Sequence, residues 1–171
     1  MRLNKKRSAM AGVGLIAALV LILALNVLPS SAQTPPAPIA TEFLTGRATF
    51  SDDVHMKFKL TFHGLHKKVV RVADPSRTVV ARYTVQPGAQ FPWHSHAGPV
   101  VVTIVSGELT YMPADDCSER KYPAGTSFVD AGQGHVHSAK NAGTEPVVFV
   151  ATFFDAPADG PLLIPATPRC Q

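Results

Sequence analysis

Short segments of alternating apolar and polar residues follow one another from Thr41 to about residue 155. In the clearest of them, residues 54–62, apolar side chains at every second position alternate with His, Lys and Thr. Because side chains of an extended strand point alternately to its two faces, this pattern predicts a half-buried strand. Further strands are expected at residues 69–72, 78–85, 100–105, 109–112, 127–129, 136–139 and 147–154.

Turns containing glycine or proline, such as Pro87-Gly88 and Ser106-Gly107, separate these segments. No segment after residue 40 shows the period of a helix. The run at residues 147–154 is apolar at both parities, which predicts a central strand buried on both faces. About nine short strands with regular turns predict an all-β domain, either a sandwich or a barrel.

The N-terminal segment has the order of an export signal. Arg2, Lys5, Lys6 and Arg7 precede an apolar run at residues 9–28, and Pro29-Ser30-Ser31-Ala32 follows. This order predicts a signal peptide at residues 1–32, cleaved after Ala32. The apolar run is also long enough to span a bilayer as an uncleaved anchor helix. In both cases the basic start leaves the domain outside, as a secreted, periplasmic or cell-surface protein.

The rest of the chain has the composition of one globular domain. Of its 171 residues, 46% are hydrophobic and 16% charged, which suits a single core. We expect a proline-rich linker at residues 33–41, a β domain at residues 42–155 and a C-terminal tail at residues 156–171. Four of the sixteen Lys and Arg precede residue 33 and none of the twelve acidic residues does. The remaining charge is therefore balanced, which argues against nucleic acid or an acidic membrane surface as a partner.

The chain contains two cysteines, Cys117 and Cys170. Export would place both in an oxidising compartment, where an even number of cysteines favours a disulfide. The bond would fasten the C-terminal tail to a loop in the middle of the chain. Closing a loop of this size contributes roughly 4 kcal/mol on the chain-entropy account.

Four of the seven histidines form two His-x-His pairs, His94-Ser95-His96 and His135-Val136-His137. Two imidazoles separated by one residue lie on the same face of a strand, about 7 Å apart, and can tilt toward one cation. Imidazole suits zinc, copper, iron and nickel. Two such pairs, each beside a turn containing glycine, predict a site for one divalent transition metal ion.

The spacing around the first pair resembles the first conserved motif of the cupin superfamily. Five residues separate Gly88 from His94, three separate His96 from Val100, and six separate Val100 from Gly107. In the family's pattern the position of Val100 is a glutamate that binds the metal. The resemblance implies a small jelly-roll β-barrel with His94 and His96 as ligands, in which Val100 faces the same interior as the two histidines.

The second pair resembles the end of the family's second motif, in which a histidine precedes an asparagine by four residues. Here His137 precedes Asn141 at that spacing, and Gly134 stands three residues before His137. The resemblance therefore implies His137 as the third ligand. His135 lies on the same side of the strand and is either a fourth ligand or, with a slip of one residue in the turn, the ligand in place of His137.

The resemblance implies a metal-dependent oxidase or dioxygenase of a small organic molecule, because three-histidine cupins include iron dioxygenases. Three neutral imidazoles leave the charge of the metal uncompensated. The metal ion expected at such a site is iron, manganese, nickel, copper or zinc. The sequence contains no nucleophile elbow, phosphate-binding glycine loop or paired interior carboxylates. The residues expected to line the interior are Val100, Tyr83, Tyr111 and Phe149.

Two other functions remain open. A cupin without a complete ligand set can bind a small molecule without catalysis, or scavenge metal outside the membrane through four imidazoles. The histidines can also be relics in a structural barrel. The family resemblance further implies a homodimer formed through strand edges.

Overall fold

The structure is a computed structural model that describes residues 38–169, apart from residues 63–65, 73–74 and 76. The expected signal peptide at residues 1–32, most of the expected linker and Cys170 lie outside the described residues. The export signal and the disulfide between Cys117 and Cys170 therefore stay predictions. Within the described part, no helix has the length and apolar character needed to cross a bilayer.

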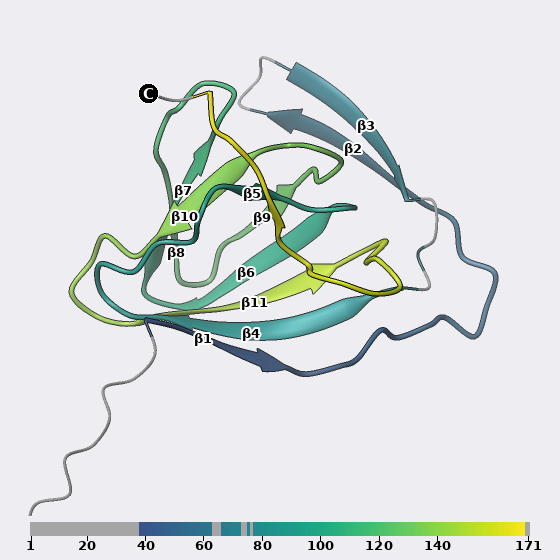
Figure 1. The fold of residues 1–171 in the computed structure, drawn as a ribbon, viewed down its shortest axis with the longest axis horizontal. Helices are drawn as coiled ribbons and strands as arrows, with labels where there is room; N and C mark the ends of the chain where they lie inside the picture. Colours follow the sequence, from purple (N-terminus) through teal and green to yellow (C-terminus); the bar gives the residue numbers. More distant parts are fainter. Residues whose placement is uncertain (1–37, 63–65, 73–74, 76, 170–171) are drawn as a thin grey trace, which may run out of the picture. The chain divides into compact units, whose positions relative to one another are not determined.

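The described residues form strands and no helix, as the sequence predicts (Figure 1). Most strands belong to two five-stranded antiparallel sheets. The first contains, in spatial order, β1 (Ile39–Phe43), β4 (Val79–Val85), β11 (Val147–Phe153), β6 (Val100–Ser106) and β9 (Ser127–Asp130). The second contains β12 (Ile164–Pro165), β5 (His94–Ser95), β10 (His137–Lys140), β7 (Glu108–Pro113) and β8 (Arg120–Pro123). The strands β2 (Met56–Phe62) and β3 (His66–Val72) form a separate hairpin.

The core lies between the two sheets and follows the alternation seen in the sequence. Every second residue of β4 and β11 is buried, and β6 shows the same pattern over its first five residues. The inward-facing residues of these three strands are Val79, Ala81, Tyr83, Val85, Val100, Val102, Ile104, Val147, Phe149, Ala151 and Phe153. The expectation that residues 147–154 are buried on both faces is wrong, because the intervening residues of β11 are only half-buried.

Two strands extend beyond the expected domain. Strand β1 begins at Ile39, inside the segment assigned to the linker, and pairs with β4. Strand β12 comes from the C-terminal tail and pairs with β5, where Pro165 lies opposite His94. Both strands are sheet edges, so the first sheet ends at β1 and the second ends at β12.

Candidate metal centre

Three of the four paired histidines meet on the inner side of the second sheet. His94 on β5 lies directly opposite His137 on β10 in the strand ladder, and His96 follows the end of β5. The centroids of the His94 and His137 rings are 4.3 Å apart, and the ring of His96 lies 4.8 Å from the first and 5.1 Å from the second. All three side chains are buried, and each has a ring nitrogen within 4.8 Å of one on the other two.

Each of the three rings holds one nitrogen against a protein oxygen. Nδ1 of His94 lies 2.7 Å from the carbonyl oxygen of Pro92, and Nδ1 of His96 lies 2.8 Å from the carbonyl oxygen of Leu162. In His137, Nδ1 lies 3.2 Å from Oδ2 of Asp130. Because a carbonyl or carboxylate oxygen only accepts, each Nδ1 carries the ring proton and each Nε2 keeps its lone pair. Outer hydrogen bonds of this kind orient histidines that bind a metal.

Asp130 is the residue that the sequence analysis missed. Its side chain is buried, and its Oδ2 accepts a hydrogen bond from the Tyr111 hydroxyl at 2.7 Å and lies 2.6 Å from Nδ1 of His135. Its Oδ1 accepts a bond of 2.8 Å from the amide of Gly132. In the ladder between β6 and β9, Asp130 pairs directly with Val100. The carboxylate absent at position 100 is therefore present on the neighbouring strand.

The structure separates His135 from the three converging histidines. Nδ1 of His135 contacts Asp130, and its Nε2 lies 3.3 Å from Oδ2 of Asp115. Asp130, His135 and His137 form a second group close enough to share a metal, but the Asp130 carboxylate already accepts a hydrogen bond from Nδ1 of His135. It is thus His137, rather than His135, that the fold brings together with His94 and His96.

Burial keeps the three converging imidazoles neutral. Burial lowers the pKa of His94 to about 4 and the pKa of His137 to about 3, and it also lowers the pKa of His96. Repulsion from His96, which acts when that ring is protonated, further lowers the pKa of His94. A neutral imidazole is the form that binds a metal, so protons compete weakly for these sites near pH 7.

The pair formed by Asp130 and His135 behaves in the opposite way. Burial lowers the pKa of His135, but the hydrogen bond to Asp130 and the charge of that carboxylate outweigh this and raise it. Burial likewise raises the pKa of Asp130, but the hydrogen bond from His135 and the neighbouring imidazoles lower it below its usual range. Asp130 is therefore ionised and places a negative charge beside His137.

These shifts predict that the metal-free protein loses stability as the pH falls from about 6.5 towards 4. The unfolded chain binds protons at the three histidines in this range, whereas folded His94 and His137 bind them only near pH 4 and 3. His135 has the opposite effect, because its raised pKa favours folding at low pH. The lowered pKa values of the other three histidines outweigh this single contribution. Thermal unfolding of chelator-treated protein measures this. A melting temperature that is constant or rises between pH 7 and 4.5 would contradict the assignment.

A small cavity adjoins the histidines between the two sheets. Its volume is about 40 Å³, and the four residues expected to line it, Val100, Tyr83, Tyr111 and Phe149, all do so. His96, His137 and Asp130 contribute to the same wall. One water molecule occupies about 30 Å³ in the liquid, so the cavity has room for a species of about that size.

Two glycines hold the histidine-bearing loops together. A Cβ at Gly132 would lie 1.9 Å from the carbonyl oxygen of Gly98, and a Cβ at Gly98 would lie 2.2 Å from that of Phe154. Next to this contact, the amide of Gln133 donates a hydrogen bond of 2.8 Å to the carbonyl of His96. The loop after His96 thus packs directly on the loop that follows Asp130.

A family model described as a cupin domain matches residues 81–153, which include His94, His96, Asp130 and His137. A conserved protein of Klebsiella pneumoniae with a double-stranded β-helix domain shares 29% identity, over 48% of this chain and 66% of its own, with a TM-score of 0.43. The matched region thus spans about two thirds of that protein.

Two further solved structures are similar at lower identity. The cupin domain of an XRE-family transcriptional regulator from Enterobacter cloacae is 17% identical over 68% of this chain and 95% of its own, with a TM-score of 0.44. The polyketide cyclase RemF from Streptomyces resistomycificus is 17% identical over 53% and 61%, with a TM-score of 0.45. No curated protein shows significant similarity to the chain.

Proposed function

The chain belongs to the cupin superfamily through residues 81–153, and from this premise we propose that it uses one divalent transition metal to oxidise a small organic molecule. The ligands are His94, His96 and His137. The observation that carries the proposal is the convergence of three buried, neutral imidazoles, each oriented by an oxygen at its Nδ1.

The donor set fits a divalent transition metal. Imidazole nitrogen suits iron, nickel, copper and zinc, and a hydrogen bond to a carboxylate makes an imidazole a stronger ligand. Nδ1 of His137 forms its hydrogen bond with the carbonyl oxygen of His135, at 3.4 Å, and Asp130, 3.2 Å from the same nitrogen, adds a negative charge that partly balances the cation. When bound, the metal supplies a Lewis acid and, if it is iron, copper or manganese, a redox centre. The chain itself supplies the ligands and a cavity that holds a species of about the size of water.

The arrangement favours an open site over the closed site of a metal scavenger. A scavenging site is expected to surround the ion with four imidazoles, but His135 is held by Asp130 and Asp115. Three protein ligands beside a small cavity match the pattern of catalytic sites, which keep one position free for water or substrate. A ligand-binding module without catalysis is the second candidate, because the cavity beside the ligands is too small for an organic substrate.

Cobalt(II) loading with azide distinguishes an open site from a closed one. We expect cobalt-loaded protein to show visible ligand-field bands that shift when azide is added, because the anion takes the free position. The His135→Ala variant serves as a matched control and should respond in the same way. Bands that are insensitive to azide in the parent but become sensitive in His135→Ala would show that His135 is a fourth ligand, which favours the scavenger.

We further propose that the protein acts outside the cytoplasm. The basic residues before residue 8 and the apolar run at residues 9–28 support export, with cleavage after Ala32 or retention as an anchor. The intact mass of the protein recovered from the producing cells separates these outcomes. A mature chain starting at Gln33 supports a signal peptide, whereas full-length protein in the cytoplasm would contradict export.

A further inference from the structure

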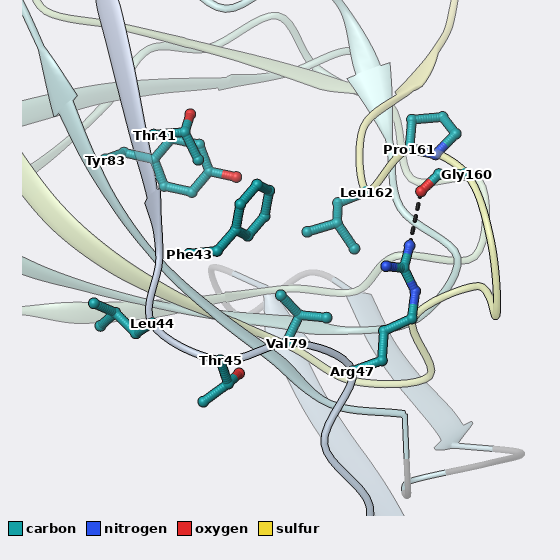
Figure 2. Close-up of a pocket in the computed structure, with 11 residues that line it drawn as sticks. Thr41, Phe43, Leu44, Thr45, Arg47, Val79, Tyr83, Gly160, Pro161 and Leu162 are labelled. Carbon is teal, nitrogen blue, oxygen red and sulfur yellow. Dashed lines mark hydrogen bonds between the residues drawn. The ribbon is translucent and has the colours of Figure 1, made fainter.

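A groove lies where the two sheets reach their open edges. Strand β1 ends the first sheet, and the segment from Gly160 to Leu162 leads into β12, which ends the second. Between them is a pocket of about 620 Å³ (Figure 2). A volume of this size is typical of sites for small organic ligands. The lining residues that carry the argument are Phe43, Leu44, Val79, Leu162, Arg47 and Tyr83.

The groove adjoins the candidate metal centre. Leu162 lines it, and the carbonyl oxygen of the same residue lies 2.8 Å from Nδ1 of His96. Tyr83 lines both the groove and the small inner cavity. In the ladder between β1 and β4, Thr41 lies opposite Tyr83, so both belong to the inner face of the sheet. One layer of side chains therefore separates the groove from the space beside the histidines.

Tyr83 presents a hydroxyl group to the groove. Its side chain is 5% exposed, and its ring stacks on Phe149 at 4.9 Å and meets Phe91 edge-on at 5.7 Å. The hydroxyl has no hydrogen-bond partner among the residues that the structure describes, and in Figure 2 it points into the groove beside Phe43. Burial raises the pKa of Tyr83 to about 12, so the hydroxyl stays protonated and can donate.

Arg47 holds a positive charge at the rim. Its Nε donates to the carbonyl of Pro157 at 2.5 Å and its Nη2 to that of Gly160 at 2.8 Å, which fixes the guanidinium over the groove (Figure 2). Both acceptors are uncharged, and within the described part of the chain no carboxylate pairs with Arg47. The side chain is thus oriented without being neutralised, and guanidinium geometry suits a carboxylate.

The remaining wall is apolar and open to water. The side chain of Phe43 is 65% exposed and that of Leu44 is 42% exposed, although both lie beside a pocket. Exposed apolar groups that gather in a groove with a few oriented polar groups are the usual signature of a ligand site. The Tyr83 hydroxyl, the Arg47 guanidinium and the apolar wall together indicate which kind of ligand the groove binds.

From this geometry we infer that the groove binds a small organic acid with an apolar or aromatic body. Its carboxylate lies at Arg47, its body packs on Phe43 and Leu162, and an acceptor on it receives the hydrogen bond of Tyr83. The inference goes beyond the proposed function, because one layer of side chains separates the groove from the space beside the histidines. Binding itself does not require the metal.

Calorimetric titration with 3-phenylpropionate, its amide and propionate tests the inference on the full chain. We expect the phenyl acid to bind at least about ten-fold more tightly than either of the others, because only it satisfies both Arg47 and the apolar wall. Arg47→Met should weaken the acid about 10- to 100-fold and leave the amide unchanged, since a bond to a charged group is lost. Tyr83→Phe should weaken the acid about five-fold, for a neutral hydrogen bond.

Arg82→Met is the matched control, because Arg82 is adjacent to Tyr83 on β4 but faces outward and pairs with Glu42. It should bind the acid like the parent. Equal effects of Arg47→Met and Arg82→Met, or no preference for the phenyl acid, would overturn the inference. Self-association that Phe43→Glu abolishes, without binding of any probe, would instead make the groove an interface between copies.

Metal content measured on the same samples separates this inference from the proposed function. Binding of the phenyl acid by protein that takes up no metal would leave the groove assigned and refute the metal-dependent reaction. Stoichiometric metal with no binding of the acid would refute the assignment of the groove and leave the proposed metal site in place.

Discussion

Replacing His94 by alanine is expected to remove metal binding. The ring of His94 is buried and lies 4.3 Å from that of His137, and its Nδ1 is held by the carbonyl oxygen of Pro92, which leaves Nε2 as the atom that can bind a metal. Loss of one of three ligands should weaken affinity by more than about 100-fold, since loss of an outer-shell partner alone costs 10- to 100-fold. Metal that binds only the folded protein stabilises it by about 2.7 kcal/mol when the free metal concentration is 100 times Kd, and this raises the melting temperature. His94→Ala should abolish that rise.

The matched control for this variant is His55→Ala. His55 has an imidazole of the same kind, but its side chain is 91% exposed and lies outside the cluster. Metal affinity measured by competition with a chromogenic chelator should be unchanged in this control. If His94→Ala kept the affinity of the parent while folding normally, the assignment of the ligands would be refuted.

Asp130→Asn is expected to reduce metal affinity by an amount between those of His55→Ala and His94→Ala. The amide keeps the shape of the carboxylate but removes the charge beside His137, and it also weakens the bonds from Tyr111 and His135. We expect metal affinity to fall about 10- to 100-fold, less than for His94→Ala. An affinity equal to that of the parent would show that Asp130 supports the fold and not the metal.

Gly132→Ala is expected to have the largest effect on stability. The new Cβ would lie 1.9 Å from the carbonyl oxygen of Gly98, and a backbone atom has no flexible side chain that could move away. The residue also has a φ of +58°, which adds strain for alanine. Together these effects should lower the free energy of unfolding by more than about 4 kcal/mol, and metal affinity should fall because the two histidine loops separate.

Gly134→Ala isolates the steric part of this effect. Gly134 lies two residues away with a φ of +81°, but a Cβ there would meet nothing within 4 Å. This control carries the backbone strain without the clash and should cost about 1 kcal/mol. Chemical denaturation of both variants provides the comparison. Similar losses in the two would show that the contact between Gly98 and Gly132 is not what holds the loops.

The strand pattern and the histidine spacing predict the main features of the fold and of the candidate site. Alternation at residues 78–85 and 100–105 places the inward residues of β4 and β6 correctly, because burial on one face imposes a period of two. The two His-x-His pairs indicate a cluster. The motif spacing selects His137 over His135, and the structure brings His137 opposite His94.

The missed features depend on contacts between distant segments. Asp130 ends a strand of four residues, and only its pairing with Val100 shows that its carboxylate lies next to the position of the absent glutamate. Strands β5 and β12 contain two residues each, too few to show a period. The groove is formed by Arg47, Tyr83 and Leu162, which lie far apart in the sequence and share no motif.

Elemental analysis of the full-length protein, purified without a metal-affinity tag, tests the central claim most directly. The proposed site predicts about one equivalent per chain of iron, manganese, nickel, copper or zinc, lost on replacement of His94. A chain that contains none of these metals, and binds none after incubation with each in turn, would contradict it.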